Sequence, residues 1–562
     1  MIQTQAQAAR DLIETLVAGG VRSAVISPGS RNTPLVLAAE ACAGLRCHVA
    51  IDERVAGFMA LGMSRVSGCP TLLICTSGSA LAHYLPAALE ASASRIPMII
   101  LSAARPLELT DCGAPQALNQ AEVLRSALRW SRQLPIADER GAAAWAAAGC
   151  EALSASWGAP EGVVHLNCPF REPLWVEGLE TSARPSPSLV PSLPMPDLRA
   201  LDGVAARLNG RRGVVLCGPM HGASAHDERL ERALTRFAER IGWPVFAEPA
   251  SRLSGRLGSC EIGYFDRLLR AGFVEAHEPD VVLQLGAGAT SKVVRQWLAQ
   301  RQGDLIVLDR DGLWRDPSWR AALLIAGDEA AALEGLSDRL DEAPLPDHLQ
   351  RWRQGRLAIE SSLRTEGWSE AAAMRFAVSR YETAVVASSL PIRHLEGWVP
   401  LSDHPRRVVS NRGLNGIDGT IATAIGVAQS VDHAVLAVVG DVACVHDLGA
   451  LAQVVAEQPR LTVMVIDNGG GGIFRRLPIA QHDTAFERYF ETKPAIDLAR
   501  TAQGMGLQVT TVTQFDELEE AFSSASSSVA PGLVLVRVDP AQDQAWRNSS
   551  DGAARALVAG CL

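Results

Sequence analysis

The sequence predicts an α/β protein with three αβ domains, each built on a mainly parallel central sheet. Three observations lead to this fold class. Short apolar segments alternate with helical patterns along the chain, which is typical of parallel sheets covered on both faces. With 562 residues, 48% of them hydrophobic, the chain can bury several cores. A segment rich in Pro and Ser over residues 177–198 predicts an extended linker after the first domain.

The first block, residues 1–176, repeats one pattern. A helical pattern is followed by a strand over 23–27, and a strand over 71–76 is followed by a helix and a strand over 98–102. The first two strands run directly into turns rich in Gly and Ser. Because parallel sheets bind ligands at the carboxyl ends of their strands, we expect both turns at a binding edge.

Two further αβ blocks follow the linker. The central block, residues 199–345, is predicted to contain strands over 213–217, 281–285 and 305–309. The last block, residues 346–562, opens with polar, helix-forming sequence that spans 342–365, and it is predicted to contain strands over 434–439 and 462–466.

Charge and cysteine usage exclude several classes of protein. The formal net charge is −10, with 62 acidic and 52 basic residues, so the chain has no global positive field for nucleic acid or an anionic membrane. We find no signal-peptide pattern at the start and no apolar run of the ~18 residues that a membrane span needs. The eleven cysteines are scattered without a Cys-x-x-Cys pair. We therefore expect a cytoplasmic protein.

The last block carries the most specific chemistry. Gly440 and Asp441 end one predicted strand, and Asn468 ends the next, 27 positions after Asp441. A carboxylate, an amide oxygen and a nearby backbone carbonyl suit Mg²⁺. Glycines 469–472 would let the backbone approach a diphosphate. Either piece alone is most often a turn after a strand, but together they are typical of thiamine diphosphate enzymes.

Seven segments, spread over most of the chain, carry a more specific resemblance. In their order they resemble the family of 2-succinyl-5-enolpyruvyl-6-hydroxy-3-cyclohexene-1-carboxylate synthases, enzymes of menaquinone biosynthesis. The resemblance implies the thiamine diphosphate-dependent enzyme fold, with a pyrimidine-binding domain (1–176), a linker (177–198), a central domain (199–345) and a diphosphate and Mg²⁺ domain (346–562). The segments are SPGSRNTPL, DERVAGFMALG, CTSGSALAHYLPAALEAS, DCGAPQAL, HLNCPFREPL, SNRGLNGIDG and DNGGGGIFRRLP.

The resemblance also implies cofactor residues. Glu53 matches the glutamate that activates thiamine diphosphate by pairing with its pyrimidine ring. Ile417 matches the apolar residue that holds the cofactor bent. Asp441, Asn468 and the carbonyl of Gly470 would bind Mg²⁺, with Mn²⁺ as an alternative ion. The complete cofactor-binding set is Glu53, Ser389, Leu390, Gly416, Ile417, Gly440, Asp441, Asn468, Gly470, Ile473 and Phe474.

The substrates that the resemblance implies are 2-oxoglutarate and isochorismate, both dicarboxylates. The implied reaction decarboxylates 2-oxoglutarate and adds the resulting succinic-semialdehyde carbanion to isochorismate in a Stetter-type 1,4-addition. Guanidinium groups match carboxylates in a bidentate way, so several arginines are expected in the site. The implied substrate-binding residues are Ser30, Arg31, Gln116, Lys292, Arg393, Arg412, Ile473, Phe474 and Leu477.

Members of the family are homodimers or dimers of dimers, with the cofactor held between the first domain of one subunit and the last domain of another. The same assembly is expected here. Ala104, Pro115 and Val293 differ from residues common in the family. These departures lie beside substrate positions and touch neither the expected metal ligands nor Glu53.

Two alternatives remain open at this stage. Another thiamine diphosphate-dependent 2-oxo acid decarboxylase or carboligase would share the metal motif, although it is not expected to combine SPGSRNTPL with SNRGLNGIDG. A non-catalytic nucleotide-binding protein could use the central block. That block contains only partial forms of a dinucleotide-binding Gly motif, LCGPMHGAS and QLGAGATSK.

Overall fold

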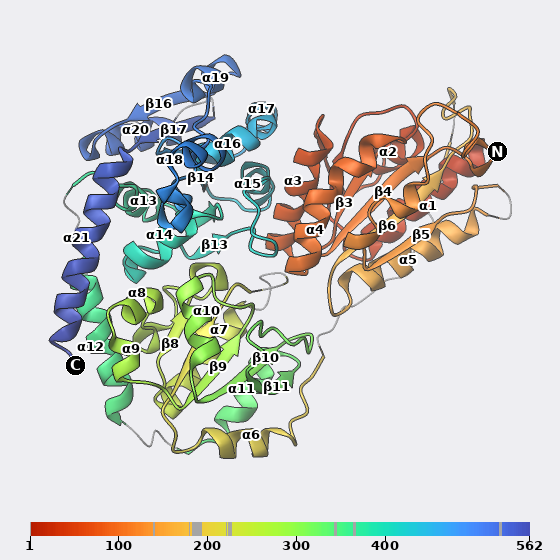
Figure 1. Ribbon diagram of the computed structural model, residues 1–562. Coiled ribbons are helices and arrows are strands. Elements are labelled where there is room, and N and C mark those ends of the chain that lie inside the picture. Colours follow the sequence, from red (N-terminus) through yellow and green to blue (C-terminus); the bar gives the residue numbers. More distant parts are fainter. Residues whose placement is uncertain are drawn as a thin grey trace.

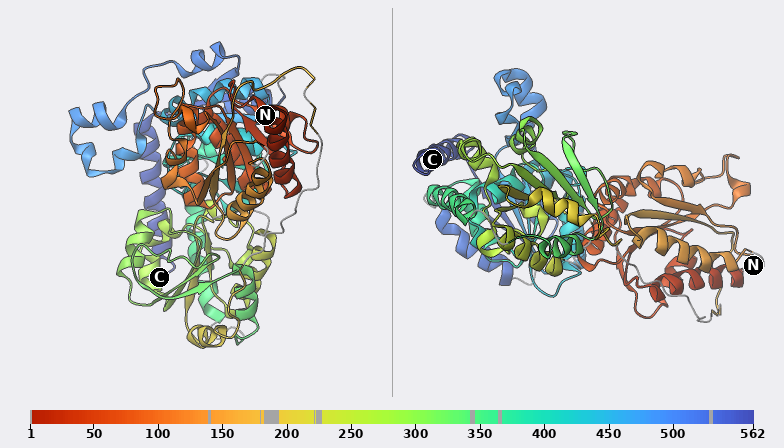
Figure 2. Two further views of the ribbon diagram at one scale, coloured as in Figure 1. Left: turned by 90° about the vertical axis from the view of Figure 1, so that its right-hand side faces the viewer. Right: turned by 90° about the horizontal axis from the view of Figure 1, so that it is seen from below.

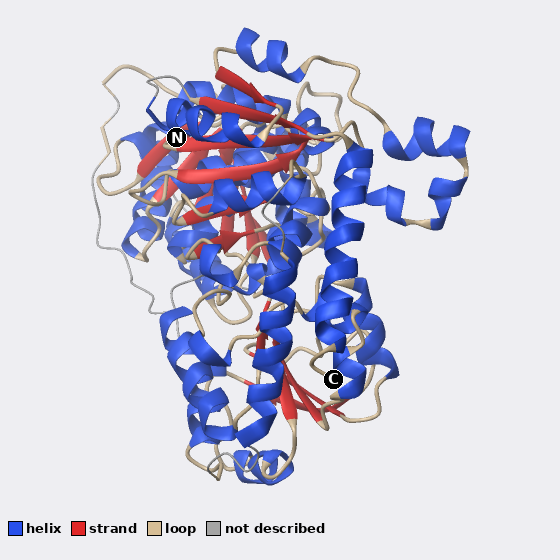
Figure 3. Ribbon diagram, turned by 90° about the vertical axis from the view of Figure 1, so that its left-hand side faces the viewer, coloured by secondary structure: helices blue, strands red, loops and turns tan. Residues whose placement is uncertain are grey.

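The computed structural model contains three αβ domains (Figure 1). It describes residues 2–138, 141–178, 180–181, 194–220, 222, 227–341, 346–363, 367–527 and 531–562. Most of the linker expected over 177–198 therefore lies outside the described residues. In every domain the strands lie between layers of helices (Figure 3). This confirms the expected fold class.

The N-terminal domain is built on a six-stranded sheet in which every pair is parallel. The edge strands are short and mostly polar, so the apolar pattern does not predict them; of the four inner strands it predicts the first three in the chain and misses the buried one over 163–169. The order is β2 (Arg46–Val49), β1 (Ser23–Ile26), β3 (Thr71–Cys75), β4 (Met98–Ala104), β6 (Val163–Pro169) and β5 (Trp130–Gln133). Its helices are α1 (Ile2–Ala18), α2 (Thr33–Glu40), α3 (Glu53–Ser67), α4 (Leu85–Ser94) and α5 (Ala143–Trp157).

The central domain has a five-stranded parallel sheet. Its strand order is β11 (Ala321–Ala326), β10 (Asp304–Asp309), β9 (Val281–Leu285), β7 (Gly213–Cys217) and β8 (Val245–Ala247). The principal helices are α6 (Leu201–Leu208), α7 (Asp227–Ile241), α8 (Phe265–Arg270), α10 (Lys292–Gln300) and α11 (Glu329–Ser337). Helix α12 (Pro346–Ser362) packs here through Trp352, whose ring contacts Phe246, Phe265 and Phe273.

The C-terminal domain repeats the topology of the N-terminal one. In both sheets the second strand of the domain lies at one edge, next to the first strand. The fifth strand lies at the other edge, next to the sixth. The order is β13 (Arg407–Val409), β12 (Thr383–Val386), β14 (Val435–Gly440), β15 (Leu461–Asp467), β17 (Gly532–Arg537) and β16 (Gln508–Val512). The main helices are α13 (Glu370–Val378), α14 (Leu390–Trp398), α15 (Thr420–Ala428), α16 (Asp441–His446), α17 (Leu448–Glu457), α19 (Leu498–Gly504), α20 (Leu518–Ser527) and α21 (Pro540–Ala559).

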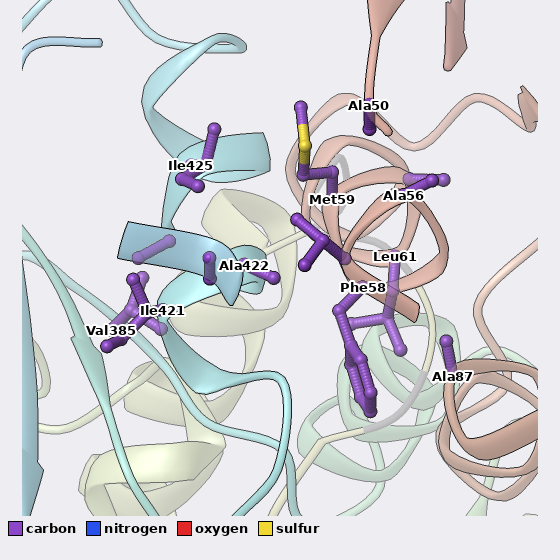
Figure 4. Packing of buried hydrophobic residues seen from close by; sticks show 14 of the residues in the cluster. Ala50, Ala56, Phe58, Met59, Leu61, Ala87, Val385, Ile421, Ala422 and Ile425 are labelled. Carbon is purple, nitrogen blue, oxygen red and sulfur yellow. The ribbon is translucent and has the colours of Figure 1, made fainter. Parts of the chain in front are cut away.

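The two six-stranded domains pack directly against each other. Helix α3 of the N-terminal domain lies against α15 of the C-terminal domain, and their apolar side chains form one core (Figure 4). Glycines allow the close approach of the two backbones. A Cβ at Gly62 would lie 2.2 Å from the carbonyl oxygen of Thr423, and one at Gly426 would lie 2.0 Å from that of Met59. The two domains are therefore joined by a close contact between helix backbones.

Gly426→Val should weaken this contact. The new side chain meets the backbone of α3, which cannot move as a flexible side chain can. Overpacking of this kind costs about 1–3 kcal/mol of unfolding free energy, to be measured by chemical denaturation. Gly552→Ala in α21 is the control, because a Cβ there meets no atom within 4 Å. Equal stability of both variants would contradict the packing described.

His165 couples stability to pH. It lies fully buried in β6, its Nε2 is 2.7 Å from Ser102 Oγ, and burial lowers its pKa to about 4. The unfolded state takes up a proton below about pH 6.5, whereas the folded state does not until about pH 4, so stability falls as the pH drops through this range. The loss from this group should reach about 3 kcal/mol at pH 4.

Denaturation of the parent chain and of His165→Gln at pH 7 and pH 4.5 measures this contribution. Glutamine keeps a donor near Ser102 and cannot titrate. The variant should therefore lose less stability on acidification than the parent. An unchanged loss would exclude His165 as the cause.

Candidate active site

A cavity opens at the carboxyl edge of the C-terminal sheet, where β14 and β15 end. It is open to solvent and has a volume of about 110 Å³. Residues from five segments of the C-terminal domain line it: Glu370; Ser388, Ser389, Leu390 and Pro391; Ile417; Gly440, Asp441, Val442 and Ala443; and Ile466, Asn468, Gly470, Gly471, Gly472, Ile473 and Phe474. The two expected strand-end motifs therefore share one cavity.

Asp441 and Asn468 are the polar side chains expected to hold a metal. The Asp441 carboxylate accepts the N–H groups of Val442 at 2.8 Å and Gly470 at 2.6 Å. Its pKa is raised to about 7, mainly by burial and also by the nearby carboxylates of Asp467 and Glu370. Asn468 donates from Nδ2 to Glu370 at 2.9 Å, while its buried Oδ1 has no hydrogen-bond partner. A divalent cation would bind both the Asp441 carboxylate and Asn468 Oδ1.

Two glycines shape the backbone around the cavity. A Cβ added at Gly440 would meet no atom within 4 Å, so the space beside it is open. Gly470 has a φ of +117°, and a Cβ there would lie 2.0 Å from the carbonyl oxygen of Glu491. Only glycine suits that position. The residues present thus fit a diphosphate bound with a cation.

Helix α14 and the loop before α15 supply the rest of the cavity wall. Ser389, at the start of α14, has a φ of +75°, a conformation rare for a residue with a side chain. This conformation brings the backbone of Ser389 and Leu390 to the cavity. Ile417, in the loop before α15, also lines the cavity, whereas its neighbour Gly416 does not.

A carboxylate from the N-terminal domain anchors that loop. Glu90, in α4, is buried and accepts the N–H groups of Gly413 at 2.8 Å and Leu414 at 2.7 Å. These two residues lie between Arg412 and Ile417 in the chain. Glu90 therefore connects the N-terminal domain to a loop that carries two expected site residues.

Glu90→Gln should loosen this loop. Its single amide oxygen can replace only one of the two carboxylate oxygens, so one buried N–H loses its acceptor, at a cost of about 1–3 kcal/mol. Hydrogen exchange of the Gly413 and Leu414 amides should become faster than in the parent chain. Ser94→Ala is the control, because it removes another hydrogen bond to the same carboxylate and leaves both carboxylate oxygens in place for the loop amides. Unchanged exchange in Glu90→Gln would exclude the anchoring role.

Three arginines gather beside the cavity, at the border with the central domain. Arg393 donates to the carbonyl of Ser389 at 2.5 Å, and Arg412 donates to Ser388 Oγ at 3.3 Å. Burial lowers the pKa of both, and Arg295 of α10 lowers both further. Arg295 is a residue that the motif comparison misses. Arg295 lies three residues after Lys292, the exposed first residue of α10. On a helix this spacing places the two side chains on the same face, and it is the sequence signal that could have indicated Arg295.

The expected site residues of the N-terminal domain lie elsewhere. Glu53 is half-buried at the start of α3, and Ser30 and Gln116 are exposed. Arg31 donates to the carbonyl of Phe170 at 3.0 Å and to Glu172 at 2.7 Å. Among the described residues, none of this domain lines the cavity.

Apolar side chains near Glu53 are exposed. Val49 is 59% and Ile51 is 81% solvent-accessible, although both lie within four residues of Glu53. Leu477, which also does not line the cavity, lies in a segment with α18 (Asp483–Phe486) that projects from the C-terminal domain (Figure 2). The N-terminal half of the expected site and the cavity are thus separate within one chain.

Comparison with known proteins identifies the class. Residues 6–123 match the family model of the thiamine pyrophosphate (thiamine diphosphate) enzyme N-terminal binding domain, residues 202–372 that of the middle domain, and residues 397–538 that of the C-terminal binding domain. The chain is therefore a thiamine pyrophosphate enzyme, and the binding domains confirm the expected cofactor.

Curated relatives narrow this class. A 2-succinyl-5-enolpyruvyl-6-hydroxy-3-cyclohexene-1-carboxylate synthase of Myxococcus xanthus is 38% identical over 94% of both chains. Proteins of the same name from Dechloromonas aromatica and Geobacillus kaustophilus are 36% and 34% identical, over 94% and 95% of this chain and 97% and 95% of theirs. The chain belongs to the family of 2-succinyl-5-enolpyruvyl-6-hydroxy-3-cyclohexene-1-carboxylate synthases. Among the described residues, no helix is long and apolar enough to cross a membrane.

Proposed function

We propose that this chain forms its family's product from 2-oxoglutarate and isochorismate, with release of CO₂, in menaquinone biosynthesis. The observation that carries the proposal is the juxtaposition of a cation and diphosphate cavity with three arginines. Two dicarboxylate substrates need such a cluster. Arg393 joins both parts directly, because it lies on the helix whose first turn lines the cavity.

Each part of the site has a distinct task. Bound thiamine diphosphate supplies the carbanion chemistry that side chains lack. Asp441, Asn468 and the carbonyl of Gly470 would hold Mg²⁺, or Mn²⁺ in its place, and Ile417 would support the bound cofactor. Arg393, Arg412 and Arg295 bind substrate carboxylates, while Ile473 and Phe474, which line the cavity, exclude water from the reacting atoms.

The complete site requires a second copy of the chain in this proposal. Glu53 belongs with the cofactor's pyrimidine ring, yet it does not contact the cavity of its own chain. Exposed Val49 and Ile51 beside it supply apolar surface for an interface. We therefore infer a homodimer or a dimer of dimers in which Glu53, Ser30, Arg31 and Gln116 of one chain complete the cavity of another, while Lys292 contributes from the central domain. We also infer a cytoplasmic enzyme, since its eleven cysteines are all free thiols.

A substrate assay tests the proposal. Purified protein with thiamine diphosphate and Mg²⁺ is given 2-oxoglutarate alone, isochorismate alone, or both, and CO₂ release, isochorismate absorbance and product mass are followed. We expect consumption of both substrates in equal amounts only when both are present with cofactor. Decarboxylation of 2-oxoglutarate with isochorismate untouched would instead indicate another carboligase of the same class.

A further inference from the structure

The orientation of the Asn468 side-chain amide decides whether this residue can bind a metal ion. The two ends of an asparagine amide have nearly the same shape, but only the oxygen can bind a cation. In this structure the oxygen is buried without a hydrogen-bond partner, and the nitrogen donates to Glu370. The residue that accepts from the nitrogen therefore decides which end is available to a metal.

We propose that Glu370 is a positioning residue for the metal site and fixes the Asn468 amide with its oxygen free to bind the cation. This inference rests on the proposed metal site. The distance from Asn468 Nδ2 to Glu370 Oε1 is 2.9 Å. An ionised carboxylate only accepts hydrogen bonds. A flipped amide would place two oxygens in contact, with the hydrogen bond lost.

Glu370 is itself held from three sides. Its Oε2 lies 2.7 Å from Nε2 of His394, and its backbone N–H donates to Asp543 at 3.0 Å. Ser369 caps the helix that Glu370 begins. Glu370, His394 and Asp543 are each at most 3% exposed, so water cannot replace these contacts.

Sequence motifs do not reveal the contact between Glu370 and Asn468, because its residues lie far apart in the chain. Glu370 begins α13, 98 positions before Asn468, while His394 lies on α14 and Asp543 on α21. The sheet order brings β12, which follows α13, beside β14 and so near the end of β15. The side chain of Glu370 also lines the cavity, so it is close enough to influence a bound cation directly.

A double-mutant cycle on Mn²⁺ binding tests the inference. Binding to the full-length apoenzyme with thiamine diphosphate is measured from the electron paramagnetic resonance signal of free Mn²⁺. Glu370→Ala should weaken binding by about 10- to 100-fold, as is usual for partners of metal ligands. In the Asn468→Asp background the two ends are both oxygens and there is no orientation to fix. There the same change removes only the attraction of the Glu370 charge for the cation and should weaken binding much less than in the parent background.

Three controls make each outcome decisive. Asp543→Ala disturbs the same corner without touching Asn468 and should lower thermal stability more than Mn²⁺ affinity. If Glu370→Ala does not fold, Glu370→Gln replaces it, with a smaller loss in the parent background and again less loss in the Asn468→Asp background. Equal losses in both backgrounds, or no loss at all, would overturn the positioning role. If Asp441→Asn leaves Mn²⁺ binding unchanged, the proposed metal site itself fails.

Discussion

Glu53→Gln is expected to reduce 2-oxoglutarate decarboxylation by about 10²- to 10⁴-fold, the range for loss of a positioned proton-transfer group. Glutamine has nearly the same shape as glutamate but cannot share a proton with the pyrimidine ring in the way a carboxyl group can. Cofactor affinity should change little, because the metal and diphosphate contacts lie in the other domain. Steady-state rates and titration of thiamine diphosphate measure the two effects separately.

The neighbouring Asp52 is the matched control for Glu53. Its side chain caps α3 by accepting the N–H of Arg54 at 2.9 Å. Asp52→Asn keeps a residue that can cap, so both stability and turnover should remain close to those of the parent. If the two substitutions reduce turnover equally, the effect belongs to the start of the helix and the assigned role of Glu53 is wrong.

Asp441→Asn is expected to raise the dissociation constant for thiamine diphosphate with Mg²⁺ by about 100-fold or more. The change removes the one carboxylate of the expected ligand set, and a carboxylate is the strongest side-chain ligand for this ion. Calorimetric titration of the apoenzyme measures the loss. Excess chelator should give the parent chain the same low affinity.

Asp467→Asn provides the comparison for Asp441. Asp467 ends the neighbouring strand but pairs with Arg537 at 3.4 Å and does not line the cavity. Its substitution removes the same charge nearby and should leave cofactor affinity within about threefold of the parent, as for a surface ion pair. Similar losses in both variants would mean that net charge, and not ligation, controls binding.

Mixing the two inactive variants tests where the site is completed. If Glu53 of one chain serves the cavity of another, a heterodimer of Glu53→Gln and Asp441→Asn contains one intact site. With random exchange, half of the dimers are mixed and about a quarter of all sites regain activity. No recovery after proven subunit exchange would place the complete site within one chain.

Sequence alone predicted the parts of the site that are local in the chain. The Gly440–Asp441 and Asn468–Gly470 motifs were recognisable because each follows an apolar strand, and a strand end fixes the direction of the residues after it. The central strands β7 and β9 were predicted with their observed bounds. Edge strands such as β2 and β5 were not, because their short polar sequences carry no apolar pattern.

Tertiary structure alone decided which distant residues support these motifs. Glu370 contacts Asn468, Glu90 holds the loop after Arg412, and Arg295 approaches Arg393, each across domains or many strands. Such contacts depend on sheet order and on the packing of α3 against α15. The physical reason is that periodicity records which face of an element is buried but not which element covers it.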